Sequence, residues 1–263
     1  MILLSGDFHA NERHELSIVT KRALIKKYGQ NIYDNIKYHI ILGDGGFMWP
    51  NNERTDRFNY KTLALRSFPI LCVIGNHEPI LGMKNLTETD IGIGETVYQI
   101  NADPFVAYLK RGKVYFIDGI KFLVLGGALS IDKNYRTPNK TWWENEYWDE
   151  QEKVDVFKLL ETEKTFDCVI SHTGPQFINN NLFKNSPSCY EKSFDEVAIL
   201  NNKIYGKVQF KEWLCGHWHK DNYYFDKKAN QGYQYLYKTT KILEKKDNRI
   251  IPHNEYGKSY PSN

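Results

Sequence analysis

Acidic, amide and imidazole side chains recur in this sequence at short spacings, each group directly after a short apolar run. The groups are Gly6-Asp7-Phe8-His9, Gly43-Asp44, Gly75-Asn76-His77, Ser171-His172 and Gly216-His217-Trp218-His219. Carboxylate and imidazole ligands bind first-row divalent ions well, and the lack of thiolates among them argues against a structural zinc site. These residues therefore predict a metal site with oxygen and nitrogen ligands.

Asp44 is the residue around which we organise the predicted site. The apolar run Ile40-Ile41-Leu42 ends abruptly at Gly43, and Asp44 follows between glycines. A buried strand that stops there delivers one carboxylate to the rim of a sheet. Ligands of open α/β sheets bind at the carboxyl ends of the strands.

The spacing of the histidines is compatible with two ions. Asp7 and His9 are two residues apart, so both can face one ion, whereas His217 and His219 can reach different ions. An Asn ligand such as Asn76 fits a site that keeps its ions exchangeable. Two ions ~3.5–4 Å apart would share a carboxylate and hold a hydroxide for in-line attack. Phosphoryl centres are the natural substrate of such a pair.

In this order the motifs GDFH, GD, GNHE, SH and GHWH resemble those of the calcineurin-like metallophosphoesterases, from Gly6 to His219. The resemblance implies an α/β fold of mixed α+β character, a four-layer α-β-β-α sandwich. It also implies that Asp44 bridges two ions and that His77 lies beside the scissile phosphate as general acid or transition-state donor. One ion would be bound by Asp7, His9, Asp44 and His219, and the other by Asp44, Asn76, His172 and His217.

The sequence indicates the identity of the metals and of the substrate less directly than it indicates the ligands. The ligands suit Mn²⁺, Fe, Zn²⁺ or Ni²⁺, and we favour Mn²⁺. In the phosphoprotein phosphatases the GD motif continues to a second Asp and then Arg-Gly, but here Phe47 and Met48-Trp49 stand in those places. The partner that orients His77 and a phosphate-binding Arg are therefore missing from the motif. We expect a phosphodiester or nucleotide-type substrate, with Asn76, His77 and Arg136 contacting it.

Three alternatives remain at this point. A DNA nuclease of the same family is one, although the extra DNA-binding domains of such nucleases have no obvious counterpart, and a phosphoprotein phosphatase is another. A binding scaffold with a dead site is the third, but it predicts lost ligands, and every expected ligand type is present. Nucleic acid is a possible partner that no feature indicates.

Each predicted site residue also has a purely structural interpretation. The Asp and His residues could be helix caps or turn residues, Asn76 a turn residue, and His172 a loop histidine bonded to backbone. We interpret His14, His39 and His253 as ordinary. Trp142 and Trp143 could stack a base or sugar, or could simply pack a surface loop on the core.

The elements that must position these groups follow a β-α-β-α-β pattern. Strands are predicted at 1–5, 38–42 and 70–74, and helices at 12–28 and 55–67. Farther along we expect strands at 97–100, 114–117 and 121–125 with a hairpin at Asp118-Gly119, a helix at 150–163, and a long loop to about Tyr190. Strands at 169–170, 209–215, 222–226 and 233–238 complete the fold. We predict one domain over residues 1–240 and a tail over 241–263, loosely held or packed on the domain.

Composition describes an ordinary globular protein. Of the 263 residues, 41% are hydrophobic and 25% are charged, and the net charge of +3 is too small to argue for nucleic acid or membrane. No apolar run approaches the ~20 residues of a membrane helix. Met1-Ile2-Leu3-Leu4 has neither a basic leader nor a secretion-length apolar stretch, so we expect a cytoplasmic protein. The oligomeric state is not predictable from these features.

Overall fold

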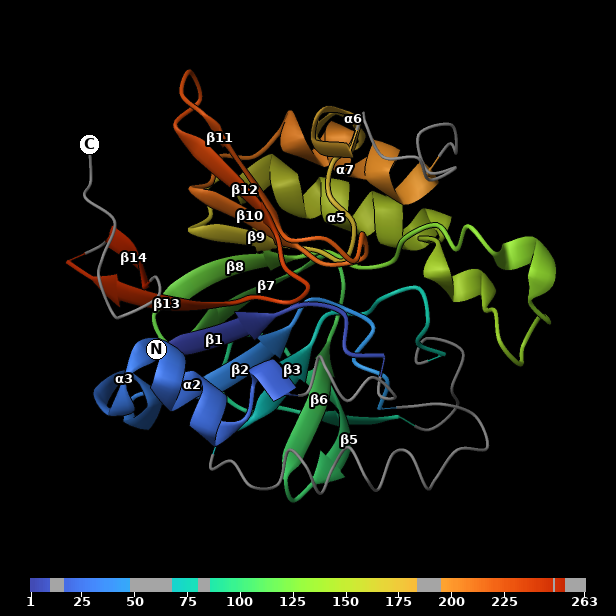
Figure 1. The fold of residues 1–263 in the computed structure, drawn as a ribbon. Coiled ribbons are helices and arrows are strands. Elements are labelled where there is room, and N and C mark those ends of the chain that lie inside the picture. The colour runs from blue at the N-terminus through green and yellow to red at the C-terminus, as the bar shows by residue number, and fades with distance from the viewer. Residues whose placement is uncertain (10–16, 48–67, 80–85, 184–194, 248, 254–263) are drawn as a thin grey trace.

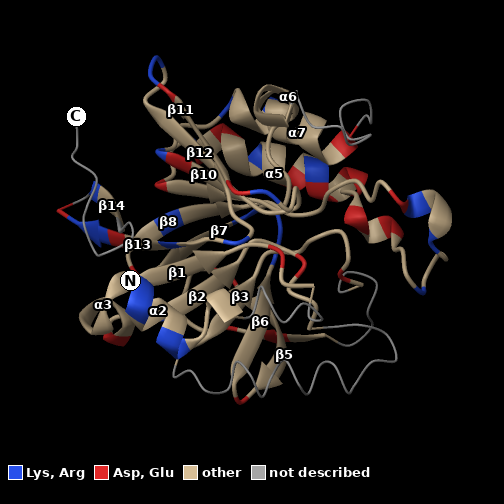
Figure 2. Cartoon of the chain, viewed as in Figure 1, with Lys and Arg blue, Asp and Glu red and all other residues tan. Residues whose placement is uncertain are grey.

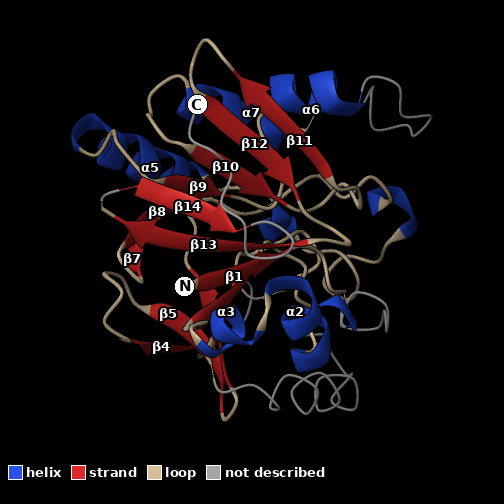
Figure 3. Ribbon diagram, turned by 60° about the vertical axis from the view of Figure 1, so that its left-hand side comes forward, coloured by secondary structure: helices blue, strands red, loops and turns tan. Residues whose placement is uncertain are grey.

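The structure of the chain is a computed structural model that describes residues 1–9, 17–47, 68–79, 86–183, 195–247 and 249–253 (Figure 1). Two mixed sheets face each other at its centre. Helices cover the outer face of each sheet, and the four layers are visible from two directions in Figure 1 and Figure 3. The predicted α-β-β-α sandwich is confirmed.

The larger sheet has the strand order β14-β13-β1-β2-β3-β6-β5-β4. Its four central strands, β1, β2, β3 and β6, run parallel to one another, and the strands outside them are antiparallel to their neighbours. The bounds are β1 (Ile2–Ser5), β2 (Tyr38–Ile41), β3 (Ile70–Cys72), β4 (Thr87–Thr89), β5 (Val97–Ala102), β6 (Phe105–Leu109), β13 (Thr240–Lys246) and β14 (Arg249–His253).

The smaller sheet has the order β11-β12-β10-β9-β8-β7. Strands β8, β9, β10 and β12 run parallel, whereas β7 and β11 are antiparallel edges. The bounds are β7 (Lys113–Ile117), β8 (Ile120–Val124), β9 (Cys168–Ile170), β10 (Glu212–Cys215), β11 (Asn222–Asp226) and β12 (Gln231–Tyr235).

Helices α2 (Lys21–Tyr28) and α3 (Gln30–Asp34) cover the larger sheet, and α5 (Glu150–Thr162), α6 (Gln176–Phe183) and α7 (Glu196–Tyr205) cover the smaller one. Two short 3₁₀ helices, η2 (Lys133–Tyr135) and η3 (Glu144–Glu146), lie between β8 and α5. Apolar side chains from both sheets, including Leu4, Leu42, Val124 and Leu214, form the central core. Burial of this apolar surface holds the two sheets face to face.

The first predicted helix is not continuous. Thr20 interrupts it and caps α2 instead, because its hydroxyl accepts a hydrogen bond from the backbone N–H of Ala23 at 3.2 Å. Gly29, at φ 92°, ends α2 as predicted. Residues 10–16 and the helix predicted at 55–67 lie outside the described residues.

The hairpin at Asp118-Gly119 is confirmed: β7 and β8 pair antiparallel, with Ile117 opposite Ile120. The long loop predicted up to Tyr190 is wrong in its first part, where α6 forms. Asn residues have low helix propensity, but Ile178 and Phe183 of α6 pack into the core over the smaller sheet. Tertiary packing outweighs local propensity here.

The segment that begins at Lys241 forms strands β13 and β14. Strand β13 pairs antiparallel with β1, with Ile242 opposite Leu3, and both side chains are buried. Thr240 accepts a hydrogen bond from the Tyr28 hydroxyl through its carbonyl oxygen. Residues 254–263 lie outside the described residues, and the division into one domain and a tail stays a prediction.

Candidate metal centre

Five strands end at the edge where the two sheets meet, and the predicted site residues follow them directly. Asp7 and His9 come after β1, Asp44 after β2, and Asn76 and His77 after β3. His172 follows β9, and His217 and His219 follow β10. Because these strands are parallel within each sheet, their carboxyl ends lie side by side. The structure brings all eight residues together.

The turns that carry these residues have an unusual backbone conformation. Left-handed φ angles occur at Asp7 (26°), His9 (43°), Asp44 (50°), His217 (69°) and His219 (48°). Non-glycine residues rarely adopt this conformation, and where it persists the surrounding structure over-determines it. The turns after β1, β2 and β10 are thereby bent sharply where their strands end.

Two glycines allow the turns to approach one another closely. A Cβ atom on Gly75 would lie 2.1 Å from Oδ1 of Asp44, and a Cβ atom on Gly43 would lie 2.1 Å from Nδ1 of His172. Any larger residue at either position would displace a predicted ligand. The glycines beside Asp44 and Asn76 are therefore part of the construction of the site.

One half of the centre is formed by Asp7, His9 and His219 around Asp44. The Nε2 atoms of His9 and His219 are 2.8 Å apart. The Nε2 atom of His9 also lies 4.0 Å from Oδ1 of Asp7 and 3.8 Å from Oδ2 of Asp44. Ligand atoms of Asp7, His9 and His219 all lie within 4.8 Å of one another, which is compatible with a single ion among them.

The other half is formed by Asn76, His172 and His217, again around Asp44. The Nε2 atom of His172 lies 2.9 Å from Oδ1 of Asn76 and 3.2 Å from Oδ2 of Asp44. The rings of His172 and His217 are 4.9 Å apart. Nδ1 of His172 lies 2.8 Å from the carbonyl oxygen of Leu42, to which it can donate, so that Nε2 is presented toward Asp44.

Asp7 is the clearest sign that this cluster could hold a cation. Its side chain is fully buried, and neither carboxylate oxygen has a hydrogen-bond partner. A buried charge without a partner is strongly unfavourable. Burial accordingly raises the pKa of Asp7 to about 7, against the opposing charges of His172 and His9. A divalent ion beside Asp7 would supply the missing partner, so the residues present fit a bound metal.

Neighbouring charges set the protonation of Asp44 and of His172. Burial disfavours the charged form of each, but their mutual attraction is stronger. The pKa of Asp44 lies well below its ordinary value, and the pKa of His172 rises to about 10. Without metal, the proton of His172 therefore supplies part of the positive charge that the buried carboxylates need.

His77 stands at the outer side of the cluster, beside Arg136. Its backbone N–H donates to Oδ1 of Asp44 at 2.9 Å, and the Nη atoms of Arg136 lie 3.1 and 2.9 Å from its two ring nitrogens. Burial, and secondarily the charges of His9 and Arg136, lower the pKa of His77 to about 4 against the attraction of Asp44. His77 is therefore a neutral imidazole at pH 7.

Arg136 itself is held by two further contacts. Its Nε donates to Oδ1 of Asp132 at 2.8 Å, and its Nη1 donates to the carbonyl oxygen of Thr141 at 3.2 Å. A guanidinium group thus reaches the site from the segment after β8, although the GD motif lacks the arginine of the phosphoprotein phosphatases. The two Nη atoms of Arg136 lie beside His77, and such a forked pair of donors matches the geometry of phosphate oxygens.

Sequence analysis missed the importance of Glu78. Its buried carboxylate accepts hydrogen bonds from the backbone N–H groups of Gly75, Asp44 (3.2 Å) and Gly46 (3.4 Å), and from the Tyr108 hydroxyl (3.1 Å). Glu78 therefore ties the turn after β2 to the turn after β3. Burial and the charge of Asp44 raise its pKa to about 7. The signal was present as the last residue of GNHE.

The residues interpreted as ordinary are not in the cluster where they are described. His39 is buried in β2, with Nε2 2.7 Å from the Ser5 hydroxyl, and His253 ends β14, whereas His14 lies outside the described residues. Trp143 is buried, as expected for a loop packed on the core, and Trp142 is half-buried beneath the ammonium group of Lys133 at 4.0 Å.

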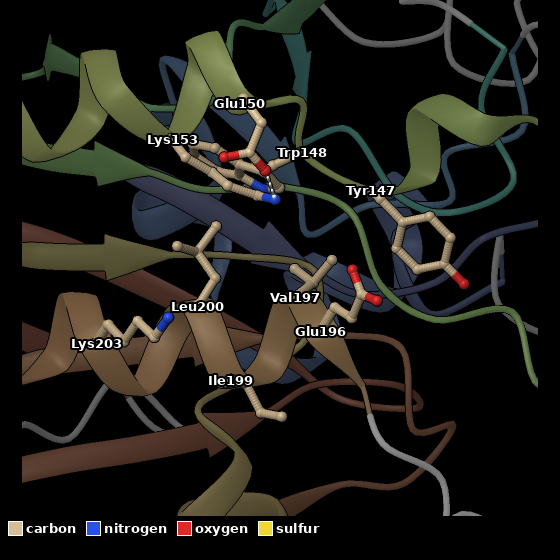
Figure 4. A pocket seen from close by; sticks show the side chains of 9 residues that line it. All are labelled: Tyr147, Trp148, Glu150, Lys153, Glu196, Val197, Ile199, Leu200 and Lys203. Atoms are coloured by element: carbon tan, nitrogen blue, oxygen red, sulfur yellow. Dashed lines mark hydrogen bonds and ion pairs between the residues drawn. The ribbon is translucent and has the colours of Figure 1, made fainter.

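A separate pocket lies between α5 and α7, away from these residues (Figure 4). Trp148, Val197 and Leu200 contribute apolar surface to it. Glu150 and Lys153, which form an ion pair at 2.7 Å, contribute charge. None of the predicted site residues lines this pocket. Its mixed lining has no cluster of metal ligands, and we assign it no role.

Comparison with solved structures places the fold among known proteins. GAP50, the anchor in the inner membrane complex of Plasmodium, is similar with a TM-score of 0.52 at 9% identity, over 98% of this chain and 84% of that one. A dimetal phosphatase from Danio rerio gives a TM-score of 0.49 at 10% identity, over 97% and 95% of the two chains. Phosphopantetheinyl hydrolase from Mycobacterium tuberculosis gives 0.45 at 10% identity, over 90% and 89%. At such low identity, the likeness to GAP50 is one of fold.

No curated protein matches the sequence. Among the described residues, no helix is long and apolar enough to cross a membrane. The family model of the calcineurin-like phosphoesterases matches residues 1–221. These residues include every candidate ligand and make up most of the 263-residue chain. The resemblance seen in the motifs is thereby confirmed, and the chain belongs to the calcineurin-like phosphoesterase family.

Proposed function

We propose that this protein is a metal-dependent phosphoesterase that uses two divalent ions to hydrolyse a phosphodiester or a nucleotide-type phosphate. One observation carries the proposal: ligand-type side chains from five strand ends meet around Asp7, a buried carboxylate without a hydrogen-bond partner. Among Mn²⁺, Fe, Zn²⁺ and Ni²⁺, all compatible with these ligands, we favour Mn²⁺. A pair of ions supplies an activated water at neutral pH and positive charge for the phosphoryl oxygens.

The roles of the ligands follow from their positions. Asp7, His9 and His219 would hold one ion, and Asn76, His172 and His217 the other, with Asp44 shared between them. The proton that His172 carries without metal has to leave when its Nε2 binds an ion, so ion binding is coupled to proton release. Burial of most of these side chains excludes bulk water and strengthens every interaction with the bound charges.

His77 and Arg136 would act on the substrate. Both lie at the outer side of the cluster, where they are only partly exposed. Neutral His77 can hydrogen-bond a phosphoryl or leaving-group oxygen, and donation from it stabilises developing charge. Arg136 would bind phosphate oxygens through its Nη atoms while Asp132 holds its Nε. Asn76 would contact the substrate from the second half of the centre.

Arg136 also bears on the choice of substrate. Because a guanidinium reaches the site, the missing arginine of the GD motif no longer argues against a phosphomonoester. Acidic and basic residues of the described part are mixed over both helical layers in Figure 2, which gives no specific support to a nucleic-acid partner. A nuclease and a phosphoprotein phosphatase therefore remain outcomes of the assay rather than separate proposals.

The test is a substrate screen with each of the four metals. Metal-free protein is loaded with Mn²⁺, Fe²⁺, Zn²⁺ or Ni²⁺ and assayed on bis-p-nitrophenyl phosphate, p-nitrophenyl phosphate, nucleotides, a phosphopeptide and single- and double-stranded DNA. We expect ester hydrolysis that disappears on chelation and in Asp44→Asn. Activity that survives both changes contradicts the mechanism. A folded wild-type chain that binds no metal and turns over no ester would instead support a scaffold.

A further inference from the structure

The chain between β8 and α5 leaves the smaller sheet and returns to it. We call this segment the excursion, and a hydrogen bond joins its two ends. The indole Nε1 of Trp148 donates to the carbonyl oxygen of Gly126 at 2.7 Å, and Trp148 is buried. The backbone N–H of Gly127 donates to the carbonyl oxygen of Ile74 at 2.8 Å. The base of this excursion therefore lies directly against the end of β3, just before Gly75 and Asn76.

Within the excursion, a buried carboxylate leads to the Asn76 side chain. Glu146 is only 1% exposed, and it accepts hydrogen bonds from the hydroxyl and from the backbone N–H of Ser130. The Ser130 hydroxyl oxygen in turn accepts from Nδ2 of Asn76 at 2.9 Å. Oδ1 of Asn76 faces the opposite way, 2.9 Å from Nε2 of His172. Glu146, Ser130 and Asn76 thus form a three-residue relay.

The donor and the acceptor of each hydrogen bond in this relay are fixed by the chemistry of the groups. An ionised carboxylate can only accept hydrogen bonds, and a serine hydroxyl has one proton to donate. When Ser130 gives that proton to Glu146, only its lone pairs remain for Asn76, so Asn76 must turn its NH₂ group toward Ser130. Its carbonyl oxygen then faces His172. Rotated by 180°, the same amide would present N–H groups to a cation and could not bind it.

The position of Glu146 is itself fixed from outside the excursion. Arg111 donates through Nη1 to the carbonyl oxygen of Asn145 at 2.9 Å and through Nη2 to that of Tyr147, the two residues that flank Glu146. Its Nε and Nη2 also pair with the Glu152 carboxylate. Arg111 is buried, so this clamp is shielded from solvent. Arg111 therefore holds the backbone on both sides of Glu146 in place.

We propose that Glu146 and Ser130 are positioning residues that hold the amide oxygen of Asn76 toward the second metal ion. This inference rests on the proposed function, since it presupposes that Asn76 is a ligand. Loss of an outer hydrogen-bond partner of a ligand typically weakens metal binding by about 10- to 100-fold. The relay predicts a loss of this size at the site that contains Asn76, His172 and His217, and little change at the other.

The experiment measures the binding of metal ions rather than enzymatic turnover. Metal-free full-length wild type, Ser130→Ala and Glu146→Gln are titrated with MnCl₂ by calorimetry and by electron paramagnetic resonance, which distinguishes a coupled Mn²⁺ pair from isolated ions. Glu144→Gln, an exposed position in the same 3₁₀ helix, is the matched control. Thermal melts of the metal-free proteins establish that each variant is folded.

We expect wild type and Glu144→Gln to bind two ions and to show the coupled signal. Ser130→Ala should bind the first ion normally and the second about 10- to 100-fold more weakly, so that the isolated-ion signal persists to higher MnCl₂. Glu146→Gln should weaken the binding of the second ion less than Ser130→Ala does, because its amide oxygen can still accept from Ser130. If Ser130→Ala does not fold, Glu146→Gln is the variant that tests the relay.

Two other results overturn different conclusions. Unchanged binding of both ions in a folded Ser130→Ala, or in a folded Glu146→Gln should Ser130→Ala not fold, refutes the relay and leaves the proposed function intact. A wild-type chain that never binds a second ion refutes the proposed function and the relay together.

Discussion

Replacing Asp7 by Asn should make the metal-free protein less sensitive to rising pH, although it removes a metal ligand. The Asp7 carboxylate is fully buried, and neither of its oxygens has a hydrogen-bond partner. In the absence of metal its negative charge opposes folding. Asn has nearly the same shape and cannot ionise, so it should remove this penalty while weakening the binding of the ion held with His9 and His219.

The sign and the size follow from the pKa of Asp7. Burial raises that pKa from 3.8 to about 7, so between these values the folded chain binds more protons than the unfolded chain. Stability of the metal-free protein is therefore lost as pH rises from about 4 to about 7. A shift of about three units corresponds to ~4 kcal/mol, and partial relaxation around the charge leads us to expect ~2–4 kcal/mol.

The assay is urea unfolding of wild type and Asp7→Asn at pH 5 and pH 8 in the presence of a chelator. His172 and Glu78 also have raised pKa values and add a fall of the same sign. Because the charge of Asp7 contributes to the raised pKa of His172, the difference between the two proteins reports Asp7 together with its effect on His172. Asp155→Asn, at an exposed position, should behave as wild type. Equal pH dependence in wild type and Asp7→Asn would refute the reasoning. Added MnCl₂ should stabilise wild type more than the variant.

Substitutions at three further positions test other contacts. Arg136→Ala should lower kcat/KM for a phosphate ester by about 10- to 100-fold, because a charged hydrogen bond is worth ~1.5–3 kcal/mol, while exposed Lys140→Ala leaves it unchanged; equal values would remove Arg136 from the site. Glu78→Gln at pH 8 leaves two buried donors facing an NH₂ group and should reduce the free energy of unfolding by ~2–6 kcal/mol; a loss below ~1 kcal/mol in denaturant melts would contradict its role. Trp148→Ala should cost ~3–5 kcal/mol and Trp148→Phe much less, near the ~1 kcal/mol of its bond to the Gly126 carbonyl; equal losses would mean that packing is not what Trp148 contributes.

The convergence of the ligands could be predicted from the sequence because it depends on local signals. An apolar run that stops at Gly-Asp or Gly-Asn marks a strand end, and parallel strands bring their carboxyl ends to one edge. Asp7, Asp44 and Asn76 lie after neighbouring strands of one sheet for this reason. His172 and His217 follow neighbouring strands of the other sheet, which faces the first across the central core.

Contacts between distant segments could not be predicted in the same way. Strand β13 has charged residues at its end and no obvious alternation, and its pairing with β1 and β14 makes it a strand. Helix α6 is rich in Asn and forms because Ile178 and Phe183 find apolar partners over the smaller sheet. In both segments the tertiary contact determines the structure, and no local pattern records it.

The excursion between β8 and α5 shows why a motif taken alone gives an incomplete account of a site. The GD motif lacks its usual arginine, which by itself argues for a site without a phosphate clamp. Arg136 nevertheless reaches His77 from a different segment, and Glu146 reaches Asn76 from the same segment through Ser130. One excursion, supported by Arg111, therefore contacts both His77, which we propose acts on the substrate, and Asn76, which we propose binds a metal ion. Its sequence is where we expect the substrate preference of this chain to be encoded, because the strand-end motifs contain little else that could select one phosphate ester over another.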